Sequence, residues 1–177
     1  MLTVERDVAA GIRLLILDVD GVLTNAHLVL GPSGEEIKEF NVRDGIGILV
    51  AQFAGIEVIF LSARVSEIVK RRAEMLGVTE LHQGKQQKLD VVREIAERHG
   101  VGLELIAYVG DDLVDMASIE AVGLGVAVGD ACRDLLESAP NVTEALGGRG
   151  AVRETVEAIL RARGDWDTVA REFLASI

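Results

Sequence analysis

The chain has 177 residues, of which 49% are hydrophobic and only 3% aromatic, so its core is aliphatic, as in parallel strands covered by helices. Its net charge of −11 repels nucleic acid and anionic lipid, so neither is an expected partner. No apolar run reaches the ~18 residues that a membrane helix needs. The single cysteine, Cys132, excludes an intrachain disulfide, and the N-terminus lacks the pattern of a signal peptide, so we expect a cytoplasmic protein.

Aliphatic runs alternate with amphipathic stretches, which predicts a single α/β domain over residues 1–177, with a Rossmann-like parallel sheet flanked by helices. The predicted strands cover residues 12–17, 57–61, 80–82, 105–109, 124–128 and 141–143. The predicted helices cover residues 44–54, 65–76, 86–99, 114–121, 151–163 and 166–175. Asp44 is the expected cap of the first helix. A turn cluster between two extended runs predicts a β-hairpin at about 27–42, and a helical tail is expected at about 151–177.

Polar side chains follow three of the predicted strands. Asp18, Ser62 and Asp111 each come directly after an aliphatic run. Because ligands of open α/β sheets bind outside the carboxyl ends of the strands, we expect these three residues to converge on one site.

Paired carboxylates at such a site indicate a metal ion. Asp18 and Asp20 point the same way on an extended backbone, and Asp111 would bring a third like charge. Mg²⁺ resolves this repulsion, prefers oxygen ligands and supplies the positive charge that an acidic chain lacks for binding a phosphate. The alternatives are an acidic turn and an EF-hand loop. The EF-hand is excluded because its fifth and twelfth positions hold Val22 and Val29.

Other polar residues are ambiguous on their own. Ser62 offers a hydroxyl and a backbone N–H to a phosphate oxygen, or else caps a helix. Lys88 begins a helix, where a lysine is disfavoured unless an anion lies nearby. The three histidines show no metal-ligand spacing, so we expect them to face solvent or to pack: His27, His82 and His99.

Taken in order, these residues resemble the motifs of the haloacid dehalogenase-like phosphohydrolases: 18–24 (DVDGVLT), 61–64 (LSAR), Lys88 and 110–115 (GDDLVD). More closely, the chain is similar to the 3-deoxy-D-manno-octulosonate 8-phosphate phosphatases. This similarity extends through residues 40–45 (FNVRDG), 82–84 (HQG) and 147–154 (GGRGAVRE). That family usually has Thr-Gly-Arg where this chain has Ser62-Ala63-Arg64.

The resemblance implies a magnesium-dependent phosphatase of lipopolysaccharide precursor synthesis that acts through an aspartyl-phosphate. In this scheme Asp18 is the nucleophile, and Asp20 is the general acid and then the general base. Ser62 and Lys88 hold the phosphoryl oxygens, with Lys88 chosen over the nearby Lys85 by alignment. The implied metal ligands are Asp18, Asp20, Asp111 and Asp112, with Asp112 acting directly or through water.

The resemblance also implies an assembly. The segments on either side of Ser62 are too short for a cap domain, so the site is open unless another subunit covers it. Similar proteins are homotetramers, which the apolar hairpin favours. The substrate carboxylate or hydroxyls would be bound by three arginines, the last of them acting across a subunit boundary: Arg64, Arg72 and Arg149.

Three alternatives stay open. The substrate could be a related nine-carbon keto-deoxy sugar acid 9-phosphate, which Arg64 disfavours. The chain could be a phosphorylation-switched binding module, although in such modules the lysine follows the hydroxyl residue near the chain end, whereas here Lys88 precedes Asp111. It could also be a regulatory subunit without activity, although all the acidic residues are present.

Overall fold

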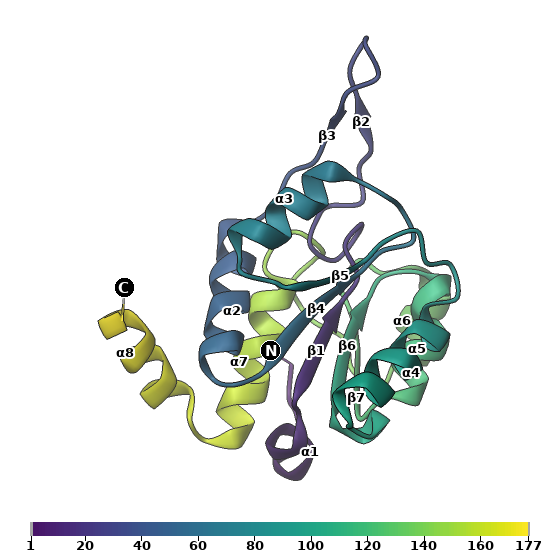
Figure 1. The fold of residues 1–177 in the computed structure, drawn as a ribbon. Coiled ribbons are helices and arrows are strands. Elements are labelled where there is room, and N and C mark those ends of the chain that lie inside the picture. Colours follow the sequence, from purple (N-terminus) through teal and green to yellow (C-terminus); the bar gives the residue numbers. More distant parts are fainter. Residues whose placement is uncertain (1, 177) are drawn as a thin grey trace.

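A five-stranded parallel sheet forms the centre of the computed structural model, which describes residues 2–176 (Figure 1). The strand order is β5-β4-β1-β6-β7. The strands are β1 (Leu14–Leu17), β4 (Glu57–Leu61), β5 (Glu80–His82), β6 (Ile106–Gly110) and β7 (Leu124–Ala127). The three central strands are almost wholly buried, as expected for aliphatic strands with helices on both faces. The predicted fold class is therefore confirmed.

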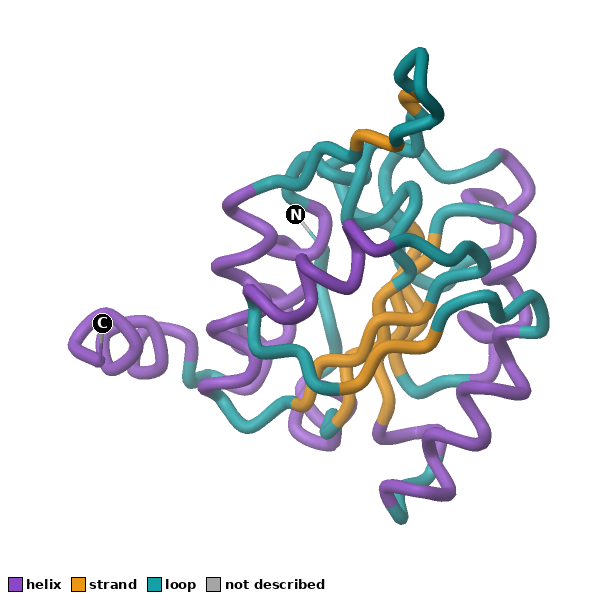
Figure 2. Tube along the Cα trace, turned by 45° about the horizontal axis from the view of Figure 1, so that its top comes forward, coloured by secondary structure: helices purple, strands orange, loops and turns teal. Residues whose placement is uncertain are grey.

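Helices cover both faces of the sheet (Figures 1 and 2). The α-helices are α1 (Arg6–Gly11), α2 (Val42–Phe53), α3 (Glu67–Met75), α4 (Lys88–His99), α5 (Met116–Ala121), α6 (Arg133–Ser138), α7 (Ala151–Arg163) and α8 (Trp166–Ser176). Two 3₁₀ turns lie at Leu103–Leu105 and Leu113–Asp115. Helices α2 and α7 pack together on one face, and α4 and α5 lie on the other. No helix among residues 2–176 is long and apolar enough to cross a membrane.

The order of the strands places the site. From β1 the chain moves outward through β4 to β5, and then crosses to β6 on the other side of β1. The direction of winding therefore reverses between β1 and β6, and the carboxyl ends of these two strands form the usual binding crevice of such a fold. Asp18 follows β1 and Asp111 follows β6 at this crevice.

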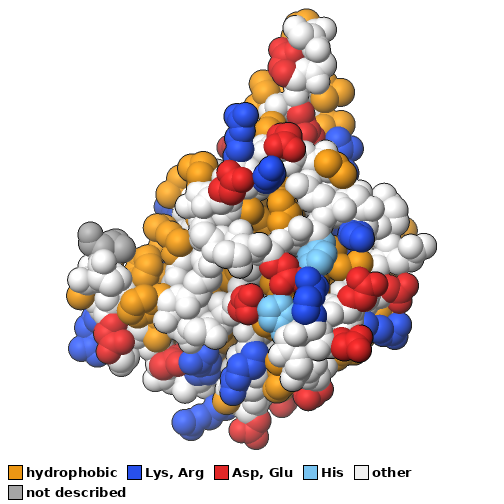
Figure 3. Space-filling view, viewed as in Figure 1, with side chains coloured by type: hydrophobic (Ala, Val, Ile, Leu, Met, Phe, Trp, Pro, Cys, Tyr) orange, Lys and Arg blue, Asp and Glu red, His pale blue; other side chains and the backbone are white. Residues whose placement is uncertain are grey.

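A short β-hairpin projects from the same end of the sheet (Figures 1 and 2). It consists of antiparallel β2 (Val29–Leu30) and β3 (Glu36–Ile37). The chain between β1 and β4 holds only this hairpin and α2, and the chain between β4 and α4 holds only α3 and β5, so neither contains a cap domain. Apolar side chains are exposed along the hairpin, as Figure 3 shows: Leu28, Val29, Leu30 and Ile37.

The start of α2 differs from the prediction. The cap is Asn41, whose side chain accepts a hydrogen bond from the backbone N–H of Arg43. Asp44 lies inside the first turn, where it is 1% exposed and accepts N–H bonds from Gly150 and Arg153 at 3.0 and 2.9 Å. Asp44 therefore ties α2 to the start of α7 instead of capping its own helix.

Smaller differences concern short elements. Helices α1 and α6 were not predicted, because six residues show too little periodicity to be recognised. The predicted strand at residues 141–143 is an isolated bridge from Val142 to Ala127.

Candidate active site

One pocket of about 250 Å³ at the carboxyl ends of the strands collects most of the residues singled out in the sequence. Its lining includes Asp18, Asp20, Ser62, Arg64, Lys88, Asp111 and Asp112. The three strand-end residues come from β1, β4 and β6, which are neighbours in the sheet. The expected convergence is thus present in the structure.

Lys88 is the centre of a buried network of charges. It begins α4 and is only 2% exposed, with Nζ 2.8 Å from Asp18 Oδ1 and 2.7 Å from Asp115 Oδ1. Burial by itself lowers the pKa of Lys88, but the carboxylates of Asp18 and Asp115 outweigh it, and the pKa is raised. Lys85, the other lysine of this segment, is exposed and lies in a different pocket. The structure therefore puts Lys88, and not Lys85, beside Asp18.

Asp115 holds this network in place and was not predicted to do so. It is fully buried, and its Oδ1 also accepts a hydrogen bond from the hydroxyl of Tyr108 at 2.6 Å. Its Oδ2 accepts the backbone N–H groups of Asp111 and Asp112 at 3.0 and 3.2 Å. Its place in the GDDLVD stretch was the only signal in the sequence, and Tyr108 gave none, since it reads as one apolar residue of a buried strand.

The carboxylates of the pocket repel one another. Burial, followed by the charge of Asp115, raises the pKa of Asp18 to about 6. Burial, followed by the charges of Asp18 and Asp115, raises the pKa of Asp111 to about 8. One oxygen from each of these three residues lies within 4.8 Å of the others. A set of hard oxygen donors whose like charges need a counter-ion fits Mg²⁺. Both oxygens of Asp115 already bond Lys88, Tyr108 and two amides, so Asp18 and Asp111 are the side chains better placed to hold Mg²⁺.

Gly21 lets these carboxylates approach the loop after β1. It has φ +97°, and a Cβ there would lie 1.8 Å from Asp111 Oδ2. Any side chain at this position would therefore both strain the backbone and displace Asp111.

Asp20 faces the hairpin as well as the pocket. Its Oδ1 pairs with Nζ of Lys38, which also lies 3.3 Å from Glu36 Oε1. Its Oδ2 is buried without a hydrogen-bond partner, 3.8 Å from Nε of Arg64. Glu36 also accepts bonds from Ser66 and Arg64 at 2.8 and 3.3 Å. The base of the hairpin is thus bonded to the pocket, which sequence reasoning missed.

Ser62 and Asp112 are partly occupied by local bonds. The backbone N–H of Ser62 donates to the carbonyl of His82 at 2.8 Å. The prediction that this N–H binds a phosphate oxygen was therefore wrong. Its hydroxyl oxygen accepts the N–H of Arg64 at 3.1 Å and keeps its own proton to donate. Asp112 accepts the N–H of Leu113 at 2.8 Å as a helix cap and lines the edge of the pocket.

The three arginines lie in different places. Arg64 lines the pocket. Arg72 packs over the ring of Phe40 at 5.5 Å and donates to the carbonyl of Asn41 at 3.3 Å, below the hairpin. Arg149 is exposed, on a separate cavity beside the start of α7. Of these three arginines, only Arg64 therefore lines the pocket that holds Asp18.

Comparison with known proteins agrees with this geometry. A family model for haloacid dehalogenase-like hydrolases matches residues 61–147. The chain is 48% identical over 159 residues to the 3-deoxy-D-manno-octulosonate 8-phosphate phosphatase KdsC of Escherichia coli K12, covering 90% of this chain and 85% of that protein. The chain belongs to the 3-deoxy-D-manno-octulosonate 8-phosphate phosphatase family. It is an enzyme of the haloacid dehalogenase-like hydrolases, as the motifs predicted.

Two solved structures of this phosphatase family have the same fold. The phosphatase from Yersinia pestis superimposes with a TM-score of 0.89 at 44% identity and covers 92% of this chain and 88% of its own. The phosphatase from Moraxella catarrhalis was solved in complex with a magnesium ion, a phosphate ion and a KDO molecule. It superimposes with a TM-score of 0.91 at 34% identity and covers 95% of this chain and 97% of its own.

Proposed function

We propose that this protein hydrolyses 3-deoxy-D-manno-octulosonate 8-phosphate to the free sugar acid and phosphate, with Asp18 as the nucleophile. The observation that carries the proposal is the position of Asp18: it is 5% exposed, at the carboxyl end of β1, with Lys88 Nζ 2.8 Å from one of its oxygens. A carboxylate held this way can attack phosphorus while its neighbours stabilise the developing charge. The names of the relatives supply the substrate.

In the first step, a carboxylate oxygen of Asp18 attacks the phosphorus and the bond to the sugar oxygen breaks. Asp20, two residues on and lining the same pocket, gives its proton to the leaving sugar oxygen. Lys88 and the hydroxyl of Ser62 bind the non-bridging phosphoryl oxygens. The product of this step is a phosphorylated Asp18 and the free sugar acid.

In the second step, Asp20 takes a proton from a water molecule, whose oxygen attacks the phosphorus and releases phosphate from Asp18. When bound, Mg²⁺ would be held by Asp18, Asp111 and the backbone carbonyl of Asp20, with Asp112 nearby, and would supply charge stabilisation for the phosphoryl group. The Lys38 ammonium keeps Asp20 turned toward the hairpin side of the pocket.

We also propose a cytoplasmic homotetramer built around the hairpin. The hairpin exposes a row of apolar side chains, and such a row is costly in a monomer. In the tetramer, Arg149 would reach the pocket of a neighbouring subunit, while Arg64 binds the sugar acid of its own pocket. Arg72, predicted to bind the sugar acid as well, does not line that pocket. Light scattering coupled to gel filtration would test this assembly, and a monomeric mass at working concentration would refute it.

Phosphate release tests the proposed function. We expect rapid release from the eight-carbon substrate with Mg²⁺, none with a chelator and none from Asp18→Asn. The control variant Asp134→Asn, which changes an exposed acid of α6, should be fully active. Faster release from the nine-carbon 9-phosphate would keep the mechanism and reject the substrate. No release from either ester would reject the proposal.

A further inference from the structure

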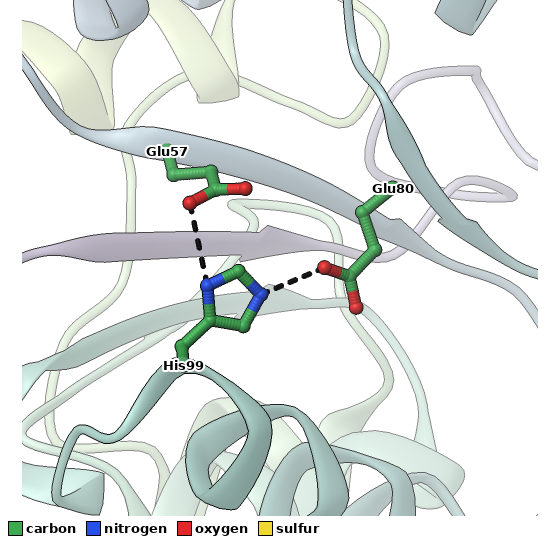
Figure 4. Close-up of side chains that lie close together, drawn as sticks. All are labelled: Glu57, Glu80 and His99. Carbon is green, nitrogen blue, oxygen red and sulfur yellow. Dashed lines mark hydrogen bonds and ion pairs between the residues drawn. The ribbon is translucent and has the colours of Figure 1, made fainter.

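A second group of side chains of the types that ligate metals lies outside the active site, on the edge of the sheet (Figure 4). It comprises Glu57, Glu80, His82 and His99, here called the edge cluster. Glu57 begins β4, whereas the active site lies beyond the other end of that strand. Figure 3 shows histidine, acidic and basic side chains grouped together on one face of the molecule.

The backbone brings these side chains to one face of the sheet. Ile59 of β4 pairs with Glu80 of β5, so Glu57, two residues earlier in β4, points to the same side as Glu80. His82 lies two residues beyond Glu80 on that face as well. His99 ends α4, which packs over this face, and its ring lies between the two glutamates (Figure 4).

The distances within the cluster are those of a compact donor set. His99 Nε2 lies 2.8 Å from Glu80 Oε2, and His99 Nδ1 lies 3.3 Å from Glu57 Oε2. One ligand atom from each of these three residues lies within 4.8 Å of the others. On the far side of the same carboxylate, His82 Nε2 lies 2.7 Å from Glu80 Oε1. Two imidazoles from different elements therefore converge on one carboxylate.

We propose that the edge cluster binds a transition-metal ion, most simply Zn²⁺, with Glu57, Glu80 and His99 as ligands. Imidazole nitrogen with carboxylate oxygen favours Zn²⁺ and related ions over Mg²⁺, which prefers oxygen alone. The active-site pocket has the opposite preference, since its donors are carboxylates. The two sites therefore select different metals.

The charges of the cluster favour a cation. Glu57 and Glu80 bring two negative charges, and Arg98 Nη2, 2.8 Å from Glu80 Oε1, brings one positive charge. The Arg98 side chain is 53% exposed and is free to turn into solvent when an ion takes its place. Zn²⁺ then takes the place of the hydrogen between His99 Nε2 and Glu80 Oε2, because the imidazole nitrogen that binds a metal must carry no proton.

The ion would fasten the end of α4 to the edge of the sheet. Lys88, at the other end of α4, is the lysine beside Asp18. Because the ligands come together only in the folded chain, the ion should stabilise the protein without taking part in catalysis. At a free Zn²⁺ concentration about 100 times the dissociation constant, Tm should rise by roughly 5–10 °C.

The test is Zn²⁺ binding by isothermal titration calorimetry in excess Mg²⁺, together with Tm measurements. We expect the native protein to bind Zn²⁺ at one site that His99→Ala weakens by at least tenfold, with loss of the rise in Tm. The matched control His27→Ala, which removes an exposed histidine of the hairpin, should bind as the native protein does. Asp111→Asn, which alters the active site, should also keep this Zn²⁺ site.

Two results would overturn the proposal. One is equal Zn²⁺ binding by His99→Ala and the native protein. The other is loss of Zn²⁺ binding in Asp111→Asn alone, which would place the ion in the active site. If circular dichroism shows that His99→Ala is unfolded, Glu80→Gln replaces it, because this change keeps the size and shape of the side chain and removes its charge, and the same outcomes apply.

Discussion

Removing one carboxylate from the active site should make the metal-free protein more stable as well as inactive. The pKa of Asp111 is raised to about 8, from an ordinary value of 3.8, chiefly by burial and then by Asp18 and Asp115. Between these two pH values the folded chain binds a proton that the unfolded chain has lost. Stability of the metal-free enzyme therefore falls as pH rises through this window.

The size of this effect follows from the same shift. From the ordinary pKa of 3.8 up to pH 7 the folded chain keeps this proton over about three pH units, which corresponds to a ceiling of about 4 kcal/mol. Asp111 is partly exposed, and solvent screens part of the repulsion. We therefore expect Asp111→Asn to stabilise the metal-free protein by about 1–2 kcal/mol at pH 7, or by roughly 2–8 °C in Tm.

Thermal unfolding in a chelator, followed from acid to alkaline pH, measures the effect. The Asn variant and the native protein should have similar Tm near pH 4. Above that pH, the Tm of the variant should exceed that of the native protein by more with each pH unit. Added Mg²⁺ should raise the Tm of the native protein and leave that of the variant unchanged. Asp134→Asn, at an exposed position, should show no such trend. If the native protein and the variant have the same Tm at every pH, this prediction is wrong.

Other substitutions test single contacts. Lys88→Met should lower turnover by roughly 100- to 1,000-fold and destabilise the protein by about 3–5 kcal/mol in urea, since it leaves two buried carboxylates without their cation. The exposed Lys85→Met should change neither, and equal effects of both would contradict this account. Tyr108→Phe should lower the free energy of unfolding in urea by about 1–3 kcal/mol, because its hydroxyl donates to a buried carboxylate, whereas an unchanged free energy would exclude that bond. Gly21→Ala should weaken Mg²⁺ binding by at least tenfold in calorimetry, while Gly55→Ala, also at positive φ but with nothing within 4 Å of a Cβ, should strain the backbone and leave Mg²⁺ binding intact.

The strand ends could be placed from the sequence because one rule governs them. Asp18, Ser62 and Asp111 each follow an aliphatic run, and parallel strands present their carboxyl ends at one edge. The rule needs only the order of the elements and not their contacts. It therefore brought together residues that are more than 90 positions apart in the chain.

Contacts between elements could not be predicted in the same way. Lys38 reaches Asp20 only because the base of the hairpin lies against the pocket, and nothing in its own segment marks it. His99 was expected to face solvent or to pack, because the histidines show no metal-ligand spacing. Its partners lie in β4 and β5, far from it in sequence, so its contacts could not be inferred. Asn41 and Asp44 are both good caps, and only the packing of α7 decides that Asp44 turns inward.

The most direct test of the central claim is chemical trapping of the phosphorylated enzyme. Borohydride reduces an acyl phosphate, so rapid quenching during turnover of 3-deoxy-D-manno-octulosonate 8-phosphate should convert Asp18 to homoserine, which mass spectrometry of the peptide detects. We expect this conversion at Asp18 only, and only in the presence of substrate and Mg²⁺. Turnover without any trapped residue, or trapping at Asp20 or Asp111, would contradict it.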